Sequence, residues 1–422
     1  MNVLWFSNTP AIGSSYLEKN FKIKGTGGWL QSLNTNIEPF VNLTVVFHYP
    51  YKIKPFEFQK TKFFPVYSGN IIWENLKRRI VSVNYDTEFL DQYLKIIEET
   101  NPDIIHIQGT ENAFLCIIGN TKKPIVVSIQ GNITVITKKY FSGFDGKYLN
   151  LKEDKFNFKS LLFGRKNFKK NLNSMVKMSK IEQKRMKNIP NVIGRTDWDF
   201  RITRVLAPSS NYFKGGEILR NGFYVNKWNN LYNKGKLILF TTSSDNYFKG
   251  LETTLHALSL LQNLGFDVEW QIAGVSETSL INKITKKYLK NIYPKKGLKL
   301  LGALDEETLI SNMLSSHIYI MPSHIENSPN NLCEAMILGM PCIATFAGGT
   351  GSIMKDQEDG ILIQDGDPWA MAGAIIELIN SPEKSLFYSN AARIKALNRH
   401  DVSNTVNQYL AIYSKIIEDR KQ

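Results

Sequence analysis

The chain has 422 residues, 43% apolar and 21% charged, an ordinary globular composition that excludes a disordered chain and a small disulfide-stapled scaffold. At roughly 100–200 residues per domain, this length predicts two to three domains. Lys and Arg outnumber Asp and Glu by 52 to 38, and the resulting charge of +14 favours anionic partners such as phosphates, acidic lipid headgroups or nucleic acid.

The first residues lack the basic segment that opens a signal peptide, so we expect no export signal. The longest apolar runs, such as 113–119, are far shorter than the ~20 residues that a membrane span needs. The three cysteines, Cys116, Cys333 and Cys342, are scattered, which favours buried thiols in a reducing cytosol over disulfides or a metal site. We therefore expect a cytoplasmic protein, either soluble or peripheral on the inner face of the plasma membrane.

Short apolar runs alternate with longer segments of helical periodicity. The apolar runs predict buried strands at 3–6, 43–47, 104–107, 125–129, 191–193, 237–240, 270–273, 318–321 and 342–345. Helical periodicity covers 88–100, 251–264, 305–315 and 332–340. This alternation predicts parallel sheets with helices on both faces, and the strands are too many for one compact sheet. We therefore predict two α/β halves.

A polar stretch at 220–235, rich in Asn and Gly, predicts the boundary between the halves. We expect an N-terminal domain at 1–225, a C-terminal domain at 226–400, and a helix at 401–422 that packs back on the N-terminal domain. Segment 151–190 carries twelve basic residues against three acidic ones. It fits a solvated helical face, a nucleic-acid track or an anionic membrane, and the apolar residues among its cations favour the membrane.

The most informative stretch is 317–351. The strand predicted at 318–321 is followed by a loop with His324 and Glu326, and a helix is expected to begin around Ser328 and Pro329. The positive end of a helix at the carboxyl edge of a parallel sheet suits a diphosphate. Carboxylates beside it suit sugar hydroxyls.

The segment PSHIENSPNNLCEAMILGMP (322–341) resembles the retaining glycosyltransferases of family 4, in which two glutamates are separated by seven residues, here Glu326 and Glu334. The segments at 246–258, 271–274 and 300–309 are similar to the C-terminal domain of that family. The segments at 7–10, 102–109 and 124–132 are similar to its N-terminal domain, and those at 193–199 and 216–224 to a subset of its members. The resemblance implies α/β architecture of the GT-B type: two Rossmann-like, doubly wound parallel-sheet domains that face a central cleft.

The resemblance also implies residue roles. Glu326 would contact the donor sugar near the reacting centre, Lys249 would neutralise the leaving diphosphate, and Glu334 would hold the ribose hydroxyls. The backbone would approach the phosphates at Asn330, Asn331, Leu332, Gly27 and Gly28. Gln130 could hydrogen-bond a hydroxyl of the acceptor or donor sugar. From the residues themselves, His106 is expected to pack at a strand end, with contact to acceptor or donor as the alternative, and His324 fits either a sugar contact or the interior. Neither a metal nor another cofactor is expected, because a lysine and a helix N-terminus can carry the leaving-group charge.

This chain departs from many relatives at two places. It has Ser243, Ser244 and Asp245 where an arginine is common, and Gln130 where a histidine is common. Asp197 and Asp199 match a metal-binding Asp-x-Asp pattern of a different glycosyltransferase fold, but we do not favour a metal site there, because the C-terminal half already supplies a metal-free site.

The sequence thus predicts a metal-independent retaining glycosyltransferase (EC 2.4 class). It would move a sugar from a UDP- or GDP-sugar to a glycan or lipid-linked acceptor, in surface polysaccharide biosynthesis. The alternatives are a basic nucleic-acid-binding protein, or a sugar epimerase or phosphorylase on the same fold. The leading interpretation expects no nucleic-acid partner.

Overall fold

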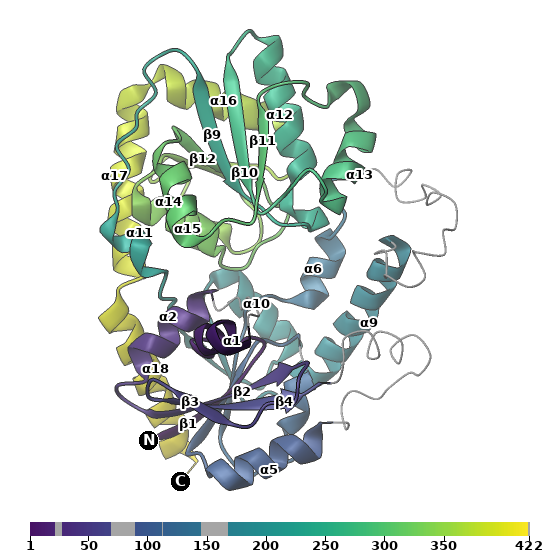
Figure 1. Cartoon of the computed structure of the whole chain (residues 1–422), viewed down its shortest axis with the longest axis vertical. Coiled ribbons are helices and arrows are strands. Elements are labelled where there is room, and N and C mark those ends of the chain that lie inside the picture. Colours follow the sequence, from purple (N-terminus) through teal and green to yellow (C-terminus); the bar gives the residue numbers. More distant parts are fainter. Residues whose placement is uncertain (22–27, 69–88, 112, 145–167, 421–422) are drawn as a thin grey trace. The chain divides into compact units, whose positions relative to one another are not determined.

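The computed structural model describes residues 1–21, 28–68, 89–111, 113–144 and 168–420 (Figure 1). The chain forms two compact units. The first unit comprises Met1–Asn132, Ile181–Arg220 and His400–Gln422, and the second comprises Ile133–Lys180 and Asn221–Arg399. The predicted boundaries differ from this division chiefly at 133–180, which cluster with the second unit. One reason is that the rings of Phe141 and Phe144 pack against Tyr247.

The first unit contains an eight-stranded sheet in the order β3-β4-β2-β1-β5-β6-β7-β8. All neighbouring strands are parallel except the antiparallel pair β3–β4. The strands are β1 (Asn2–Ser7), β2 (Asn42–Tyr49), β3 (Phe56–Phe58), β4 (Thr61–Tyr67), β5 (Ile104–Gln108), β6 (Ile125–Ser128), β7 (Asn191–Gly194) and β8 (Asn211–Lys214). Because β2 and β5 lie on opposite sides of β1, the strand order reverses there.

Alternate residues of β1 point to opposite faces of this sheet, as the period of a strand requires. Val3 and Trp5 pack with α1 (Gly13–Phe21), α2 (Gly28–Ile37) and α18 (Val402–Asp419). Leu4 and Phe6 pack with α5 (Leu90–Thr100) and η1 (Ala113–Ile117). The first unit also contains α10 (Asp197–Leu206) and the C-terminal end of α9 (Phe168–Met186). Its sheet is therefore covered on both faces.

The second unit contains a six-stranded, wholly parallel sheet in the order β11-β10-β9-β12-β13-β14. The strands are β9 (Leu237–Thr242), β10 (Val268–Ala273), β11 (Leu298–Gly302), β12 (Ile318–Met321), β13 (Cys342–Thr345) and β14 (Ile361–Ile363). The chain runs from β9 outward to β11 and then returns to the other side of β9. The junction of β9 and β12 is thus a topological switch point, where ligands of such sheets bind at the carboxyl ends of the strands.

Helices flank this sheet in Figure 1. In α12 (Leu251–Asn263) and α16 (Pro368–Asn380), apolar residues pack with β9, β10 and β12 in one core, and α15 (Asn330–Leu338) packs against α17 (Pro382–Arg399). The remaining elements are α6 (Ile133–Lys139), α11 (Asn221–Val225), η2 (Tyr247–Lys249), α13 (Leu280–Leu289), η3 (Lys290–Ile292), α14 (Glu306–Leu314) and η4 (Thr350–Ser352).

The predicted fold class is confirmed: both units are doubly wound, mainly parallel α/β structures. Each of the nine predicted strands corresponds to a strand of the structure. In the described part of the chain, β3, β4, β8 and β14 were not predicted from the sequence, and β11 overlaps the segment 300–309 that the family resemblance covers. Among the described residues, no helix combines the length and apolar character that a membrane crossing requires.

Candidate functional site at the switch point of the second unit

Lys249 is positioned by the glycine that follows it. Gly250 has a φ of +69°, and a Cβ built on it would lie 2.0 Å from the carbonyl oxygen of Pro322, so only glycine fits without displacement. The backbone N–H of His324 also donates to the carbonyl of Phe248, at 2.8 Å. Through these contacts η2, which follows β9, packs against residues 322–324, which follow β12.

Lys249 and Glu326 form an ion pair at this place. The Nζ of Lys249 lies 2.5 Å from Oε1 of Glu326, and the two side chains are only 19% and 11% exposed. The carbonyl of Glu326 accepts the N–H of Gly349 at 2.9 Å, and a Cβ on Gly348 would lie 2.0 Å from that same oxygen. The loop after β13 therefore fixes the backbone of Glu326.

The N-terminus of α15 lies beside the end of β9. The side-chain amide of Asn331 donates to the carbonyl of Thr242, the last residue of β9, at 3.0 Å. The helix begins at Asn330 with Pro329 at the N-cap position, so no serine or asparagine side chain caps it. The N–H of Leu332 donates to the carbonyl of Pro329 at 3.1 Å, so within this structure that donor is already occupied. The N–H groups of Asn330 and Asn331 have no acceptor within the described part of the chain.

Two buried polar atoms near this helix end lack partners among the described residues: Oγ of Ser243 and Oδ1 of Asn330. Such orphans are rare in native interiors, and a polar ligand is one way to satisfy them. Asp245, by contrast, has a structural role, because its Oδ1 accepts the N–H of Ile281 at the start of α13, at 2.7 Å. The arrangement can therefore take up phosphate or hydroxyl oxygens.

Glu334 lies in the second turn of α15, four residues after Asn330 and therefore on the same face of the helix. Its residue is 6% exposed. The pKa of the neighbouring Tyr319 is raised well above its usual value by burial and, in smaller part, by the charge of Glu334. Glu334 is thus a buried carboxylate on the helix whose first N–H groups, those of Asn330 and Asn331, have no acceptor among the described residues.

His324 does not face an open surface. It is 2% exposed, its Nε2 lies 2.7 Å from Oε1 of Glu252, and its Nδ1 lies 3.3 Å from Oδ2 of Asp365. Burial lowers the pKa of His324, but the two carboxylates outweigh burial and raise it above its usual value. Because both ring nitrogens are held, His324 is part of an internal ion cluster with Glu252 and Asp365.

Residues predicted in the first unit are placed as follows. His106 is fully buried, with Nδ1 2.7 Å from the Tyr413 hydroxyl and Nε2 2.7 Å from that of Ser128, and burial lowers its pKa to about 3. It is a core residue here, not an exposed contact for an acceptor. Gln130 follows β6, and its carbonyl accepts from the Arg195 guanidinium at 3.3 Å. Gly28 opens α2, and Gly27 lies outside the described residues.

The segments 193–199 and 216–224 are connected by Arg195, which is 5% exposed and forms an ion pair with Glu217. Asp199 is fully buried; its carboxylate accepts the N–H of Arg195 at 2.9 Å and the Tyr212 hydroxyl at 2.5 Å. These bonds make Asp199 part of the local structure. No group of three or more His, Cys, Asp or Glu residues in the described ranges could hold a metal ion.

A pair of polar residues that was not predicted from the sequence lies at the switch point of the first unit. Asn8 follows β1 and Glu111 follows β5, and the Nδ2 of Asn8 lies 2.5 Å from Oε1 of Glu111. Oε2 of Glu111 is buried with no partner among the described residues. Burial first, and then the charge of Glu182, raise the pKa of Glu111 to about 7. The sequence did contain a signal for this group, because polar residues follow both the strand predicted at 3–6 and the strand predicted at 104–107.

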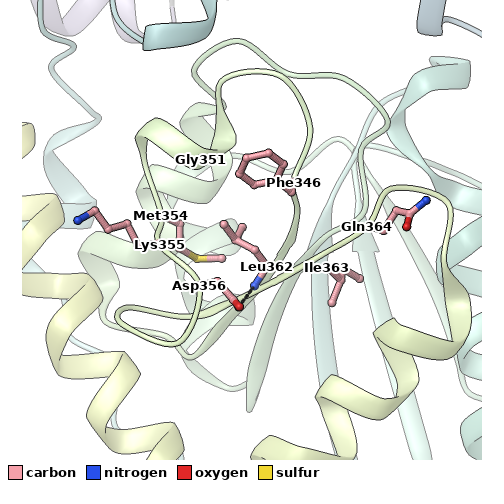
Figure 2. Close-up of a pocket in the computed structure, with 8 residues that line it drawn as sticks. All are labelled: Phe346, Gly351, Met354, Lys355, Asp356, Leu362, Ile363 and Gln364. Atoms are coloured by element: carbon pink, nitrogen blue, oxygen red, sulfur yellow. Dashed lines mark hydrogen bonds between the residues drawn. The ribbon is translucent and has the colours of Figure 1, made fainter.

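A cavity of about 570 Å³ lies at the carboxyl ends of β13 and β14 (Figure 2). It contains none of the predicted site residues. Figure 2 shows the side chains of Phe346, Met354 and Leu362 around one space, while Lys355 and Gln364 point away from it. The lining is mainly apolar, and the side chain of its one lysine, Lys355, points away from the space, so this cavity is not suited to a diphosphate. It is lined by Phe346, Gly351, Met354, Lys355, Asp356, Leu362, Ile363 and Gln364.

Comparisons with known proteins bear on this geometry. Residues 225–395 match the family model described as glycosyl transferases group 1. The chain is 27% identical over 183 residues to the phosphatidyl-myo-inositol mannosyltransferase of Mycobacterium leprae, a match that spans 43% of this chain and 47% of the relative. The chain therefore covers less than half the length of this curated relative.

Among solved structures, sucrose-phosphate synthase from Thermosynechococcus elongatus is similar, with a TM-score of 0.72 at 14% identity over 99% of both chains. HepE of Anabaena, solved with UDP and glucose, has a TM-score of 0.62 at 13% identity over 98% of this chain and 99% of that one. At these identities the likeness establishes the fold, and the chain has the GT-B fold. The matched family covers the unit that contains Lys249, Glu326 and Glu334.

Proposed function

We propose that the protein is a retaining glycosyltransferase that moves a sugar from a nucleotide diphosphate sugar to a hydroxyl group of a glycan or lipid-linked acceptor. The observation that carries the proposal is the Lys249–Glu326 pair, which lies at a topological switch point inside the region that matches the glycosyl transferases group 1 model. A nucleic-acid-binding role is not favoured, because neither comparison nor geometry supports it.

In the proposed reaction, the bond between the anomeric carbon and the diphosphate oxygen breaks while the acceptor oxygen bonds to that carbon from the same face. The acceptor proton passes to the departing phosphate. Lys249 would leave its ion pair with Glu326 and pair with the diphosphate instead. The N–H groups of Asn330 and Asn331 would donate to the diphosphate and help to stabilise the negative charge that develops on it. Glu326 would then be free to accept a hydroxyl of the donor sugar, and Glu334 to accept the ribose hydroxyls.

UDP- and GDP-sugars are the donors we propose, and no metal is needed because these residues already oppose the leaving-group charge. In the first unit we propose that Asn8 and Glu111 contact the acceptor hydroxyl. Their support is Oε2 of Glu111, which is buried without a partner in the described part of the chain, at the switch point of that sheet. This oxygen can accept a hydrogen bond from the acceptor hydroxyl and so orient it.

We further propose that α9 lies against an anionic membrane surface in the cytoplasm, as a lipid-linked acceptor in surface polysaccharide assembly would require. Val176, Met178 and Ile181 are exposed on this helix to 38%, 39% and 42%. Lys177, Lys180 and Lys184 are exposed beside them. Apolar residues among cations are typical of interfacial helices. The cations of 151–167 lie outside the described residues.

The test is product formation from a panel of UDP-, GDP-, ADP- and dTDP-sugars, with and without short glycan and polyprenyl-diphosphate acceptors. We expect nucleoside diphosphate and a glycoside of retained configuration, with activity that persists after chelation of divalent metals. Epimerised sugar without acceptor, or sugar 1-phosphate made with phosphate, would instead identify an epimerase or a phosphorylase. If no nucleotide sugar is consumed with any acceptor, the proposal fails.

A further inference from the structure

A second cavity, of about 340 Å³, lies in the second unit around the start of α12. Its volume is within the range of roughly 300–1,000 Å³ found for small-molecule sites. Neither Lys249 nor Glu326 lines it. The lining comes from four places: the loop after α6, the first turns of α12, the end of α13 and the entry to α16. The residues are Ser142, Gly143, Phe144, Glu252, Thr253, His256, Tyr288, Leu289, Gly366 and Pro368.

Glu252 is the charged group of this cavity, and the residue is only 4% exposed. One carboxylate oxygen is occupied, because Oε1 lies 2.7 Å from Nε2 of His324 and accepts the Thr253 hydroxyl at 2.9 Å. The other oxygen, Oε2, is buried with no partner in the described part of the chain. A buried carboxylate oxygen without a donor is costly, so a donor supplied by a ligand would stabilise it.

The backbone over this carboxylate has room only for glycine. A Cβ built on Gly143 would lie 2.1 Å from Oε1 of Glu252 and 2.6 Å from Nε2 of His324. Any side chain at 143 would therefore displace the Glu252–His324 pair. The glycine leaves this wall of the cavity free of side-chain bulk.

The other lining groups indicate the class of ligand. Ser142 and Thr253 carry hydroxyls, and His256, Tyr288 and Phe144 carry rings, the last two with centroids 5.1 Å apart. The unpaired oxygen of Glu252 disfavours an anion, and the charge of Glu252 is already opposed by His324, so a ligand cation is not required. The ligand that fits is a neutral molecule with hydroxyl groups and a C–H face. Its hydroxyl groups can donate to Oε2 of Glu252, and its C–H face can pack against the aromatic rings.

We propose that this cavity is a binding site for a neutral sugar or polyol, distinct from the switch-point site, in which Oε2 of Glu252 accepts a ligand hydroxyl. The site does not depend on the proposed transferase activity. It contacts the other site through His324, since the backbone N–H of His324 donates to Phe248, the neighbour of Lys249.

The test is saturation-transfer NMR on the full chain with glucose, galactose, mannose, N-acetylglucosamine and myo-inositol, in saturating UDP or GDP so that the switch-point site is filled. We expect at least one of these probes to bind. Glu252→Gln, which replaces the acceptor oxygen by an N–H donor of the same size, should weaken that binding by at least about tenfold. Ser142→Trp, at the exposed edge of the cavity, should abolish it by filling the space.

Ser311→Trp on the exposed face of α14, outside the cavity, is the matched control and should bind like the parent protein. Circular dichroism melting shows which variants fold. If Glu252→Gln does not fold, Ser142→Trp still decides the question. Equal binding by folded Ser142→Trp and Ser311→Trp overturns the proposal, as does the failure of all five probes to bind with dissociation constants below about 10 mM.

Discussion

The Nζ of Lys249 and the Oε1 of Glu326 lie 2.5 Å apart, although 77 positions separate these residues along the chain. Each charge therefore has a counter-charge before any substrate arrives. Because both side chains are largely buried, removal of one partner leaves the other charge poorly solvated. The following predictions start from this pair.

Glu326→Gln retains the size of the side chain and removes its charge. We expect nucleotide affinity to be kept or increased, because Lys249 no longer has a competing carboxylate, and turnover to fall by at least about 100-fold. Calorimetric titration with UDP and GDP and a steady-state assay separate the two effects. The control is Glu358→Gln, whose side chain is 66% exposed. Loss of nucleotide affinity together with unchanged turnover would contradict the assigned role.

Gly250→Ala tests the close approach that positions Lys249. The new Cβ would meet the Pro322 carbonyl at 2.0 Å, in addition to the strain of a φ of +69°. Gly265→Ala is matched, because Gly265 has a φ of +88° but no atom within 4 Å of its Cβ position. We expect Gly265→Ala to lower the free energy of unfolding by only about 1 kcal/mol, and Gly250→Ala by distinctly more, with loss of nucleotide affinity. Urea denaturation measures the free energy of unfolding of both variants. Equal destabilisation of the two would refute the steric argument.

Glu111→Gln should change how stability depends on pH. The pKa of Glu111 rises from its ordinary 4.5 to about 7 in the folded protein, so the folded state binds the proton more tightly. This contribution favours the folded state below pH 4.5 and is lost as pH rises from there through about 7. Glu111→Gln should therefore remove the part of the loss of stability that Glu111 causes between pH 4.5 and about 7. Melting temperatures between pH 5 and 8 measure the effect, and Glu57→Gln at an exposed position of β3 serves as the control.

His324→Gln should destabilise the second unit, because Glu252 and Asp365 lose their shared cationic partner. Breaking a buried ion pair costs about 3–5 kcal/mol. Since the pKa of His324 is raised, its stabilising contribution is complete below its usual 6.5 and fades as pH rises through the folded value. The deficit should therefore be largest in acid. In a double-mutant cycle with Glu252→Gln, the two losses should be less than additive.

Replacement of Lys177, Lys180 and Lys184 by Gln tests the membrane proposal for α9. At about 1 kcal/mol per cation near an anionic surface, the triple variant should bind acidic phospholipid vesicles roughly 100-fold more weakly. The matched control replaces Lys283, Lys286 and Lys290, which are exposed on or next to α13. Vesicle sedimentation gives the affinities. Binding to neutral vesicles as tight as binding to acidic ones would contradict the proposal.

Strands with continuous apolar runs could be predicted from the sequence because both faces of their sheets are buried. The strands that were not predicted lack that signal: β4 contains Pro65, β8 has exposed residues at both ends and half-buried residues between them, and β14 has only three residues. The proximity of Lys249 to Glu326 followed from the family resemblance rather than from local pattern. The Glu252–His324 and Asn8–Glu111 contacts could not be predicted, because they join loops that only the strand order brings together.

The roles of Glu326, Glu334 and Lys249 stay predictions until they are tested. His324 and His106 show a limit of prediction from the sequence. A histidine near a strand end is compatible with an open edge or with the interior, and tertiary packing decides between them. For His106 the deciding contact is Tyr413, in the last helix of the chain.

That helix has a consequence for biosynthesis. The hydroxyl of Tyr413 in α18 accepts the indole N–H of Trp5 in β1 at 3.1 Å, across 408 positions. The ribosome synthesises β1 hundreds of codons before α18. The face of the first unit's sheet that α18 covers is therefore exposed while the second unit is synthesised. The first unit can therefore complete its packing only after α18 has been synthesised, and until then its uncovered apolar face favours aggregation.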